Sequence, residues 1–233
     1  MFLAKELKGN RLKYKDNEYS LTFDDGPTEG VTVDLGRLLR KEKISATFFV
    51  LGEHANDEAL SELVACGHRI GNHTFSHQNL DSFKGDHSIE IPDQITRCHE
   101  RIERFSRQRI PFRAPGGAWT NPKFTKIANK LPFANRYIGR YGWDIDASDW
   151  RLHRRMGNAD KIAFDDFCRR FEEAIDRFHG GGIILLHDGV PRNEAALADR
   201  NENKVIKVAE FVIETMRKRG LRFVPLKEPS TWL

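Results

Sequence analysis

The sequence is poor in cysteine, and its cysteines have no spacing that would pair them. Cys66, Cys98 and Cys168 are the only three, and they lie far apart along the chain. This pattern argues against a disulfide framework and against a zinc site built from cysteines. We expect all three to be buried, where cysteine behaves as a small apolar residue.

Long apolar runs are also missing. No stretch approaches the roughly 18 to 20 apolar residues that a membrane-spanning helix requires, so no membrane span is expected. The first eight residues, Met1–Lys8, lack the apolar centre of a secretory leader. We therefore expect a cytoplasmic protein, or an extracytoplasmic protein from which a leader has been removed.

Neither sign of charge dominates. Lys and Arg together number 38 against 34 for Asp and Glu, the sequence pI is about 9.0, and the mean hydropathy is −0.58. This small positive excess permits anionic partners, but ordinary solubility charge explains it, so no nucleic-acid partner is expected. The sequence leaves the choice between a monomer and a homo-oligomer open.

What the chain does contain is an alternation of strand-like and helix-like segments. Its length allows one sizeable core or two small ones, and no linker divides it, so we expect one domain over residues 1–233 with a core at about 20–225. Apolar runs predict strands at residues 21–23, 46–51, 68–72, 111–113, 136–143, 182–186 and 221–225. Helical spacing predicts helices at residues 31–43, 58–65, 89–105, 122–131, 164–178 and 204–219.

Such an alternation favours a parallel sheet, either closed into a barrel or open and doubly wound. Polar residues that suit catalysis follow five of the predicted strands, and in a barrel all these strand ends meet at one face. An open sheet would bring fewer of them to one crevice. We therefore predict an α/β fold of the seven-stranded (β/α)-barrel type, with one site formed by Asp24, Asp25, His73, His77, Arg113, Asp146, Asp149 and His187.

The stretch Leu21–Pro27 ends a predicted strand with two adjacent carboxylates, Asp24 and Asp25, before Gly26-Pro27. Neighbouring strand residues point to opposite faces, so both acids serve one site only if the backbone turns there. One acid would then bind a metal while the other takes a proton. An ordinary surface turn is the alternative, because Asp, Gly and Pro are the usual turn residues.

His73 and His77 are four residues apart, which on a helical turn places both imidazoles on one face. With a strand-end aspartate they complete a set of two histidines and one carboxylate, which leaves a position open for water. Zinc is the first expectation, and cobalt, nickel or iron would fit the same set. A cation bound there would lower the pKa of its water from 15.7 to about 7.

The remaining strand-end residues suit proton transfer. With Asp25 as a ligand, Asp24 is free to act as general base, and Arg113 is placed to pair with it. His187 is suited to protonate a leaving amine, and either Asp149 or Asp146 would hold it as imidazolium. Backbone N–H groups near Gly116 would stabilise an oxyanion, so the set is suited to hydrolysis of an amide or ester.

Five ordered motifs together resemble those of the polysaccharide deacetylases, the NodB-homology or carbohydrate esterase 4 family. They are Thr22–Pro27, His73-xxx-His77, Arg113–Gly117, Asp146–Trp150 and Leu185–His187. The resemblance implies a distorted seven-stranded (β/α) barrel that removes acetyl groups from N-acetylated sugars with a divalent metal. It implies Asp24 as base, Asp25, His73 and His77 as ligands, Arg113 as partner of the base, His187 as acid, Asp149 as the aspartate that tunes it, and Trp150 and Leu185 as walls of a groove for the acetyl methyl.

One position departs from the family pattern. Gly116 stands where many members have an aromatic residue, although its backbone N–H is retained for the oxyanion. The change puts the sugar contact of the missing ring in doubt, and Trp119, three residues on, is a candidate replacement.

The leading functional hypothesis is removal of N-acetyl groups from N-acetylglucosamine-type units of a glycan or glycoconjugate. A second hypothesis keeps the site and changes the acyl group, as in an acetyl-xylan esterase, an amino-sugar deformylase or a small-amide hydrolase. A third is an inactive glycan-binding barrel, which the intact set of polar residues argues against.

Overall fold

The computed structural model describes residues 2–82, 86–153, 163–189 and 203–229. Its strands are β1 (Phe2–Leu7), β2 (Glu18–Asp24), β3 (Thr47–Val50), β4 (Arg69–Asn72), β5 (Ile110–Pro111), β6 (Tyr137–Tyr141), β7 (Ile145–Asp146), β8 (Gly182–His187) and β9 (Arg222–Phe223). Every pairing between them is parallel. One sheet has the order β4-β3-β2-β8-β7, with β9 beside the start of β2, and the other has the order β1-β6-β5.

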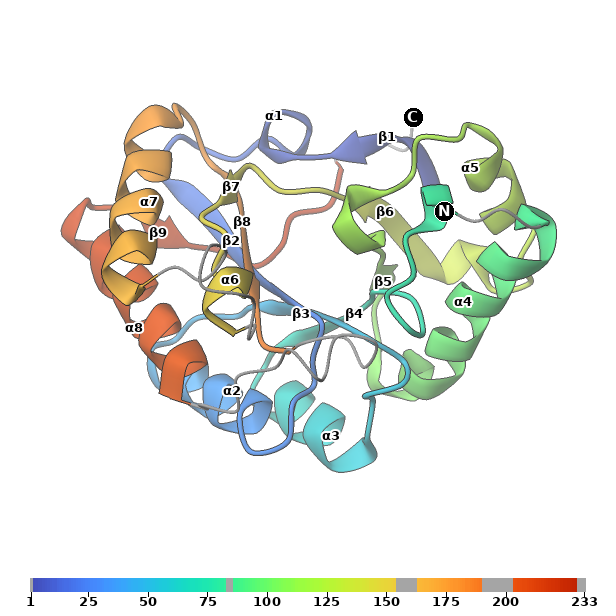
Figure 1. Cartoon of the computed structure of the whole chain (residues 1–233), viewed down its shortest axis with the longest axis horizontal. Coiled ribbons are helices and arrows are strands. Elements are labelled where there is room, and N and C mark those ends of the chain that lie inside the picture. The colour runs from blue at the N-terminus through green and yellow to red at the C-terminus, as the bar shows by residue number, and fades with distance from the viewer. Residues whose placement is uncertain (1, 83–85, 154–162, 190–202, 230–233) are drawn as a thin grey trace.

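A single bridge between Asn72 and Phe112 joins the two sheets at β4 and β5. The strands thus curve into a distorted barrel, in which β2 pairs with β3 on one side and with the distant β8 on the other. Figure 1 shows the strands at the centre and the helices around them.

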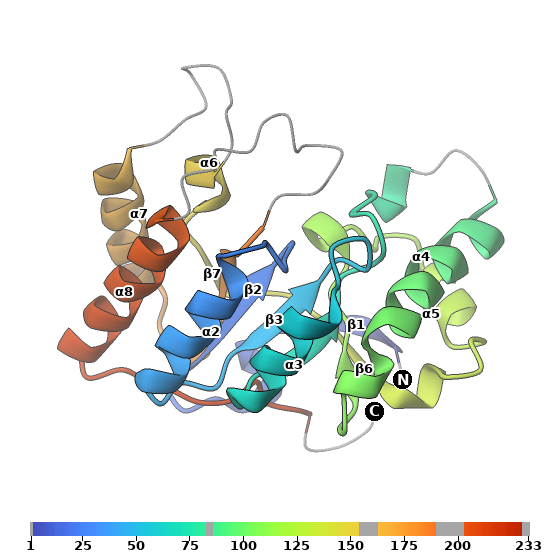
Figure 2. The ribbon, with the colours of Figure 1, turned by 90° about the horizontal axis from the view of Figure 1, so that it is seen from below.

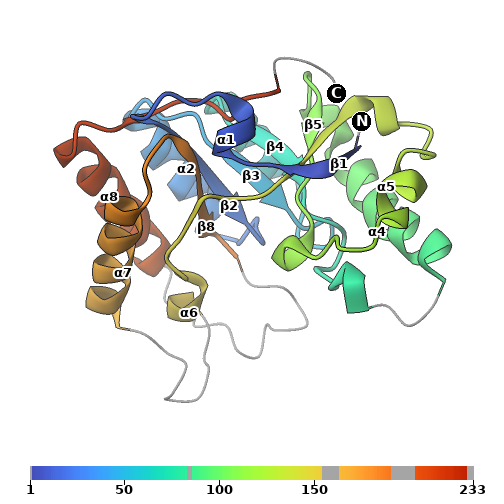
Figure 3. The same ribbon diagram turned by 90° about the horizontal axis from the view of Figure 1, so that it is seen from above.

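The helices are α1 (Gly9–Leu12), α2 (Thr32–Lys41), α3 (Asp57–Ala65), α4 (His87–Ile102), α5 (Lys123–Ala128), α6 (Trp150–His153), α7 (Phe164–Arg177) and α8 (Asn203–Lys218). Two of the longer ones begin at side-chain caps. The Asn56 side chain accepts from the backbone N–H of Ala59, and that of Asp86 accepts from Ser88. Figure 2 shows α2, α3, α7 and α8 packed along the outside of the strands, and Figure 3 shows β1 crossing the opposite side of the molecule.

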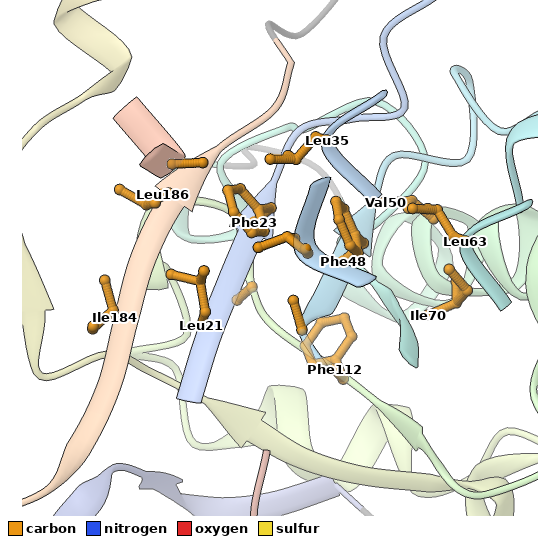
Figure 4. Close-up of a cluster of buried hydrophobic side chains, with 14 of the residues drawn as sticks. Leu21, Phe23, Leu35, Phe48, Val50, Leu63, Ile70, Phe112, Ile184 and Leu186 are labelled. Atoms are coloured by element: carbon orange, nitrogen blue, oxygen red, sulfur yellow. The ribbon is translucent and has the colours of Figure 1, made fainter. Parts of the chain in front are cut away.

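The main core lies between the strands and these outer helices. All seven residues of β2 are buried, as expected for a parallel strand that is covered on both faces. Leu21 and Phe23 of β2 pack in one cluster with Leu35 of α2 and Leu63 of α3 (Figure 4). Each such side chain contributes roughly 1.5–3 kcal/mol by leaving water. The alternate residues of β2 are polar, and two of them, Thr22 and Asp24, contact Arg113 in the site described below.

Each of the predicted strands and helices has a counterpart in the structure, and the barrel class is confirmed. The prediction missed β1, β7, α1 and α6, because elements as short as two to six residues carry too little periodic signal. The expectation for cysteine holds only for Cys98, since Cys66 and Cys168 are half-buried. Across the described residues, no helix is both long enough and apolar enough to cross a membrane.

Candidate active site

The turn after β2 brings both adjacent aspartates to the same place. Asp25 has a left-handed backbone conformation, with φ at +75°, which breaks the alternation of the strand. As a result Nε2 of His73 lies 3.5 Å from Oδ2 of Asp24 and 3.4 Å from Oδ1 of Asp25. Asp24 and Asp25 are only 3% and 2% exposed, so this is not an ordinary surface turn.

His73 and His77 lie in a loop after β4, and the expectation of a helical turn was wrong. Thr74 and His77 have left-handed φ angles of +73° and +56°, which no helix contains. Asn72 holds the start of the loop through its Oδ1, which accepts from the N–H of Thr74 at 2.8 Å. Oε1 of Gln94, from α4, accepts from the next two backbone N–H groups at 3.2 and 3.1 Å.

The loop nevertheless brings the three predicted ligands together. One ligand atom from each of Asp25, His73 and His77 lies within 4.8 Å of the others. Nδ1 of His73 donates to the backbone carbonyl of Arg113 at 2.9 Å, so in the neutral ring Nε2 carries a lone pair. That lone pair is 3.4 Å from a carboxylate oxygen, Oδ1 of Asp25, which is buried and has no hydrogen-bond partner among the described residues. Two electron-rich atoms in that arrangement fit a cation between them.

The electrostatics of His77 agree with a ligand role. Burial lowers the pKa of His77 to about 4, and the attraction of Asp25 offsets this only in part. Its imidazole is therefore neutral at physiological pH, as ligation requires, and its Nε2 lies 3.3 Å from Oδ1 of Asp25. Burial also acts to raise the pKa of Asp25, but the closeness of His73, His77 and His187 holds it well below its usual range.

Arg113 is fully buried and fixes Asp24. Its Nη1 donates to Oδ1 of Asp24 at 2.7 Å and to the Thr22 hydroxyl at 2.9 Å. Nη2 donates to the carbonyl of Gly142 at 3.0 Å, and the guanidinium carbon lies 4.1 Å from the centre of the Phe49 ring. The predicted pairing of Arg113 with Asp24 is confirmed, and these contacts hold the guanidinium in one orientation.

His187 ends β8 directly beside the end of β2, because Asp24 and His187 are partners in the register of the two strands. Nδ1 of His187 donates to Oδ1 of Asp149 at 2.8 Å, and its backbone N–H donates to Oδ2 of the same residue. Burial lowers the pKa of His187, but the charge and hydrogen bond of Asp149, with Asp25 and Asp24, raise it to about 10. Asp146 is exposed and caps the N–H of Ser148, so of the two candidates Asp149 is the partner.

The predicted substrate residues divide into two groups. Leu185 precedes His187 by two residues on β8 and is buried, and Trp150 follows Asp149 at the start of α6 and is half-buried. Gly116 lies in a 3₁₀ turn with φ at +56°, and a Cβ there would meet no atom within 4 Å. Leu185 lies on the same face of β8 as His187, and a substrate contact by these three residues stays a prediction.

Trp119 is in the core instead. It is 5% exposed, its ring packs against Phe2, Phe112 and Phe124, and its Nε1 donates to the hydroxyl of Thr125. The prediction that Trp119 replaces the missing aromatic ring in the substrate contact is therefore wrong. The indole packs instead among the aromatic rings of Phe2, Phe112 and Phe124. The half-buried ring beside the Gly116-Gly117 turn belongs to Trp143, whose Cη2 would lie 3.4 Å from a Cβ at Gly117.

Sequence reasoning also missed three residues that support the motifs. Asn72 and Gln94 hold the histidine loop, and Asp188 is buried directly after His187. Asn72 and Asp188 stand next to residues that were identified, so adjacency was the available signal. Gln94 had no signal, since it is one polar residue within a helix.

Comparisons with known proteins agree with this site. A family model described as polysaccharide deacetylase matches residues 11–135. The chitooligosaccharide deacetylase of Azorhizobium caulinodans is 31% identical over 222 residues, which cover 93% of this chain and 96% of that protein. A peptidoglycan-N-acetylglucosamine deacetylase of Bacillus cereus is 33% identical over 216 residues, 91% of this chain and 68% of that protein.

Among solved structures, the chitin deacetylase from the fungal pathogen Colletotrichum lindemuthianum superposes with a TM-score of 0.68. The match covers 94% of this chain and 91% of that chain at 21% sequence identity, and so shows the same fold. The family-model match extends across the segments that carry Asp24, Asp25, His73, His77 and Arg113. This chain is a member of the polysaccharide deacetylase family.

Proposed function

We propose that the protein removes N-acetyl groups from N-acetylglucosamine units of a polysaccharide or glycoconjugate. The observation that carries this proposal is the arrangement of two buried charge pairs around one ligand triad. Asp24 with Arg113 and His187 with Asp149 stand at the adjoining ends of β2 and β8, next to Asp25 of the triad. That arrangement supplies a base for the water that attacks the acyl carbon and an acid for the nitrogen that leaves it.

Asp25, His73 and His77 would hold the metal, and we propose zinc, with cobalt, nickel or iron as alternatives. Two imidazoles and one carboxylate are a ligand set found in catalytic zinc sites. When bound, a divalent cation supplies Lewis acidity and lowers the pKa of a coordinated water to about 7. Metal analysis of the purified protein decides between these ions.

The residues of the chain carry the proton transfers. Asp24 accepts a proton from the attacking water, while Arg113 keeps its carboxylate in one orientation. His187, charged through Asp149, then gives its Nε2 proton to the leaving nitrogen. The backbone N–H of Gly116 contributes to binding of the developing oxyanion. The C–N bond of the amide breaks, and acetate and a free amine leave.

The names of the relatives support the substrate class. One is a chitooligosaccharide deacetylase and another a peptidoglycan-N-acetylglucosamine deacetylase, and both substrates contain N-acetylglucosamine. Leu185 and Trp150 would contact the acetyl methyl. The open space at Gly116 leaves room for a larger substituent on the sugar than an aromatic side chain at that position would allow.

The test is acetate release from a panel of N-acetylated and O-acetylated glycans, with and without a chelator. We expect release from N-acetylglucosamine oligomers that stops on chelation and returns with added metal. Release that a chelator leaves unchanged would refute the metal-dependent mechanism. Release from acetyl-xylan alone would favour the esterase alternative, and binding without turnover would favour an inactive glycan-binding barrel.

A further inference from the structure

Asp188 is a buried carboxylate that none of the proton transfers above uses. It directly follows His187 and is 1% exposed. Its Oδ2 accepts a hydrogen bond of 2.5 Å from the hydroxyl of Thr32, and the same hydroxyl oxygen accepts from the N–H of Thr28. One carboxylate therefore connects the end of β8 to the start of α2, and so to the segment that follows the two aspartates.

The side chain of Asp188 also packs directly on that segment. A Cβ built on Gly26 would lie 2.1 Å from Oδ2 of Asp188, closer than any real contact allows. One residue on, a Cβ on Gly189 would lie 2.4 Å from the backbone carbonyl oxygen of Asp25. The N–H of Asp188 completes the contact by donating to the carbonyl of Asp24 at 3.1 Å. The end of β8 thus covers the Asp25-Gly26 turn with no room for a methyl group.

The opposite side of the same turn is held from the loop after β3. The N–H of Leu51 donates to the carbonyl of Gly26 at 2.9 Å, and Nδ1 of His54 donates to that of Asp25 at 3.0 Å. The turn is thus clamped between two loops. Such contacts matter because a non-glycine residue with positive φ is strained, and such conformations persist where the surroundings enforce them.

We propose that Asp188 is a positioning residue for this site. Its hydrogen bond to Thr32 and its contact with Gly26 hold Asp25 in the left-handed conformation that directs its carboxylate, with that of Asp24, toward His73. Its removal would let the turn relax, and Oδ1 of Asp25 would leave the two imidazoles. The inference rests on the proposed metal-dependent function, but metal affinity and turn stability are measured without any substrate.

The first experiment compares three variants for Zn²⁺ affinity by chelator competition and for the absorption spectrum of the Co²⁺-loaded protein. We expect Asp188→Ala to weaken metal binding about 10- to 100-fold, as outer partners of metal ligands commonly do, and to alter the Co²⁺ spectrum. Asp188→Asn should retain most of the affinity, because its amide oxygen still accepts from Thr32. Asp34→Ala, an exposed aspartate on the same helix as Thr32, is the matched control and should match the wild type.

The second experiment is a double-mutant cycle on Gly26 and Asp188 in the metal-free protein, with thermal stability as its readout. Gly26→Ala should lower stability strongly in the wild type and much less in Asp188→Ala, because the atoms that clash are then gone. A Gly26→Ala effect of equal size in both backgrounds would overturn the contact on which the proposal depends.

Wild-type Zn²⁺ affinity and an unchanged Co²⁺ spectrum in Asp188→Ala would overturn the positioning role, even if the variant lost stability. A wild-type protein that binds Zn²⁺ and positions Asp25 as proposed, but releases no acetate from any glycan, would refute the proposed function and leave this inference standing. The two failures are therefore distinguishable.

Discussion

Two buried charge pairs lie beside the candidate ligand triad, and we propose that they use the same chemistry in opposite ways. In one pair the carboxylate of Asp24 is the proposed base, and Arg113 holds it at 2.7 Å. In the other the imidazole of His187 is the proposed acid, and Asp149 holds it at 2.8 Å. The side chain of each holder is 0% exposed, whereas those of Asp24 and His187 are 4% and 12% exposed. In each pair the residue that we propose to react is therefore the more exposed one.

The holders are also held differently. Arg113 is fixed by two backbone carbonyls, the Thr22 hydroxyl and an aromatic face, and its own carbonyl accepts from His73. Asp149 accepts two hydrogen bonds from His187, one from Nδ1 of the ring and one from the backbone N–H. Asp24 is thus linked through Arg113 to His73, a candidate metal ligand, whereas Asp149 acts on His187 directly. The following predictions test that distinction.

The largest effect is expected from Asp24→Asn. The amide keeps the shape of the side chain but takes no proton, so kcat should fall at least about 100-fold. Metal content should stay near that of the wild type, because Asp25, His73 and His77 remain. Acetate release and metal analysis on the same preparation check this. A variant with near-normal kcat would mean that Asp24 is not the base.

Asp149→Asn should reduce kcat about tenfold at neutral pH and more strongly in alkaline solution. Burial lowers the pKa of His187 and Asp149 is the largest contribution that raises it, so without Asp149 the pKa should fall, because only Asp25 and Asp24 still oppose burial. The imidazole then loses its proton at a lower pH, so the alkaline limb of the kcat profile should move to lower pH. An unmoved limb would show that His187 is not the acid or that Asp149 does not tune it.

The same pair should be visible in the stability of the metal-free protein. Because the pKa of His187 in the folded protein is about 10, against an ordinary value near 6.5, the pair stabilises fully below pH 6.5, and this contribution is lost as pH rises toward 10. The unfolding free energies of wild type and Asp149→Asn should therefore converge by about 2 kcal/mol or more across that interval. Urea unfolding at several pH values measures this, and a constant difference would contradict the assignment.

The smallest effects on catalysis concern the two tryptophans near the third motif. Trp143→Ala should raise KM a few-fold, because its ring packs beside Gly117 and lies 5.8 Å from the Arg113 guanidinium, whereas Trp143→Phe should stay close to wild type. Trp119→Ala should instead leave kcat/KM unchanged and cost about 3–5 kcal/mol of stability as a core truncation. A reversed result would return Trp119 to the substrate groove.

Much of the site was predictable because its residues stand at strand ends, which are local features of the sequence. Seven short apolar runs separated by helical patterns indicated the barrel, and Asp24, Asp25, His73, His77, Arg113 and His187 each stood just after or at the end of such a run. In a parallel barrel those positions converge whatever the details of packing. Family membership and the ligand triad followed from the same residues.

The sequence by itself determined the barrel class, most of the residues that meet at the carboxyl ends of the strands and the class of chemistry that they suit. Only the tertiary structure decided that Asp149 rather than Asp146 holds His187, that the histidine loop is not helical, and that Trp119 belongs to the core. It also showed that the side chain of Asp188 packs directly against Gly26. These outcomes depend on distances between segments far apart in the chain, and no local pattern encodes which of two nearby side chains is buried against a distant partner.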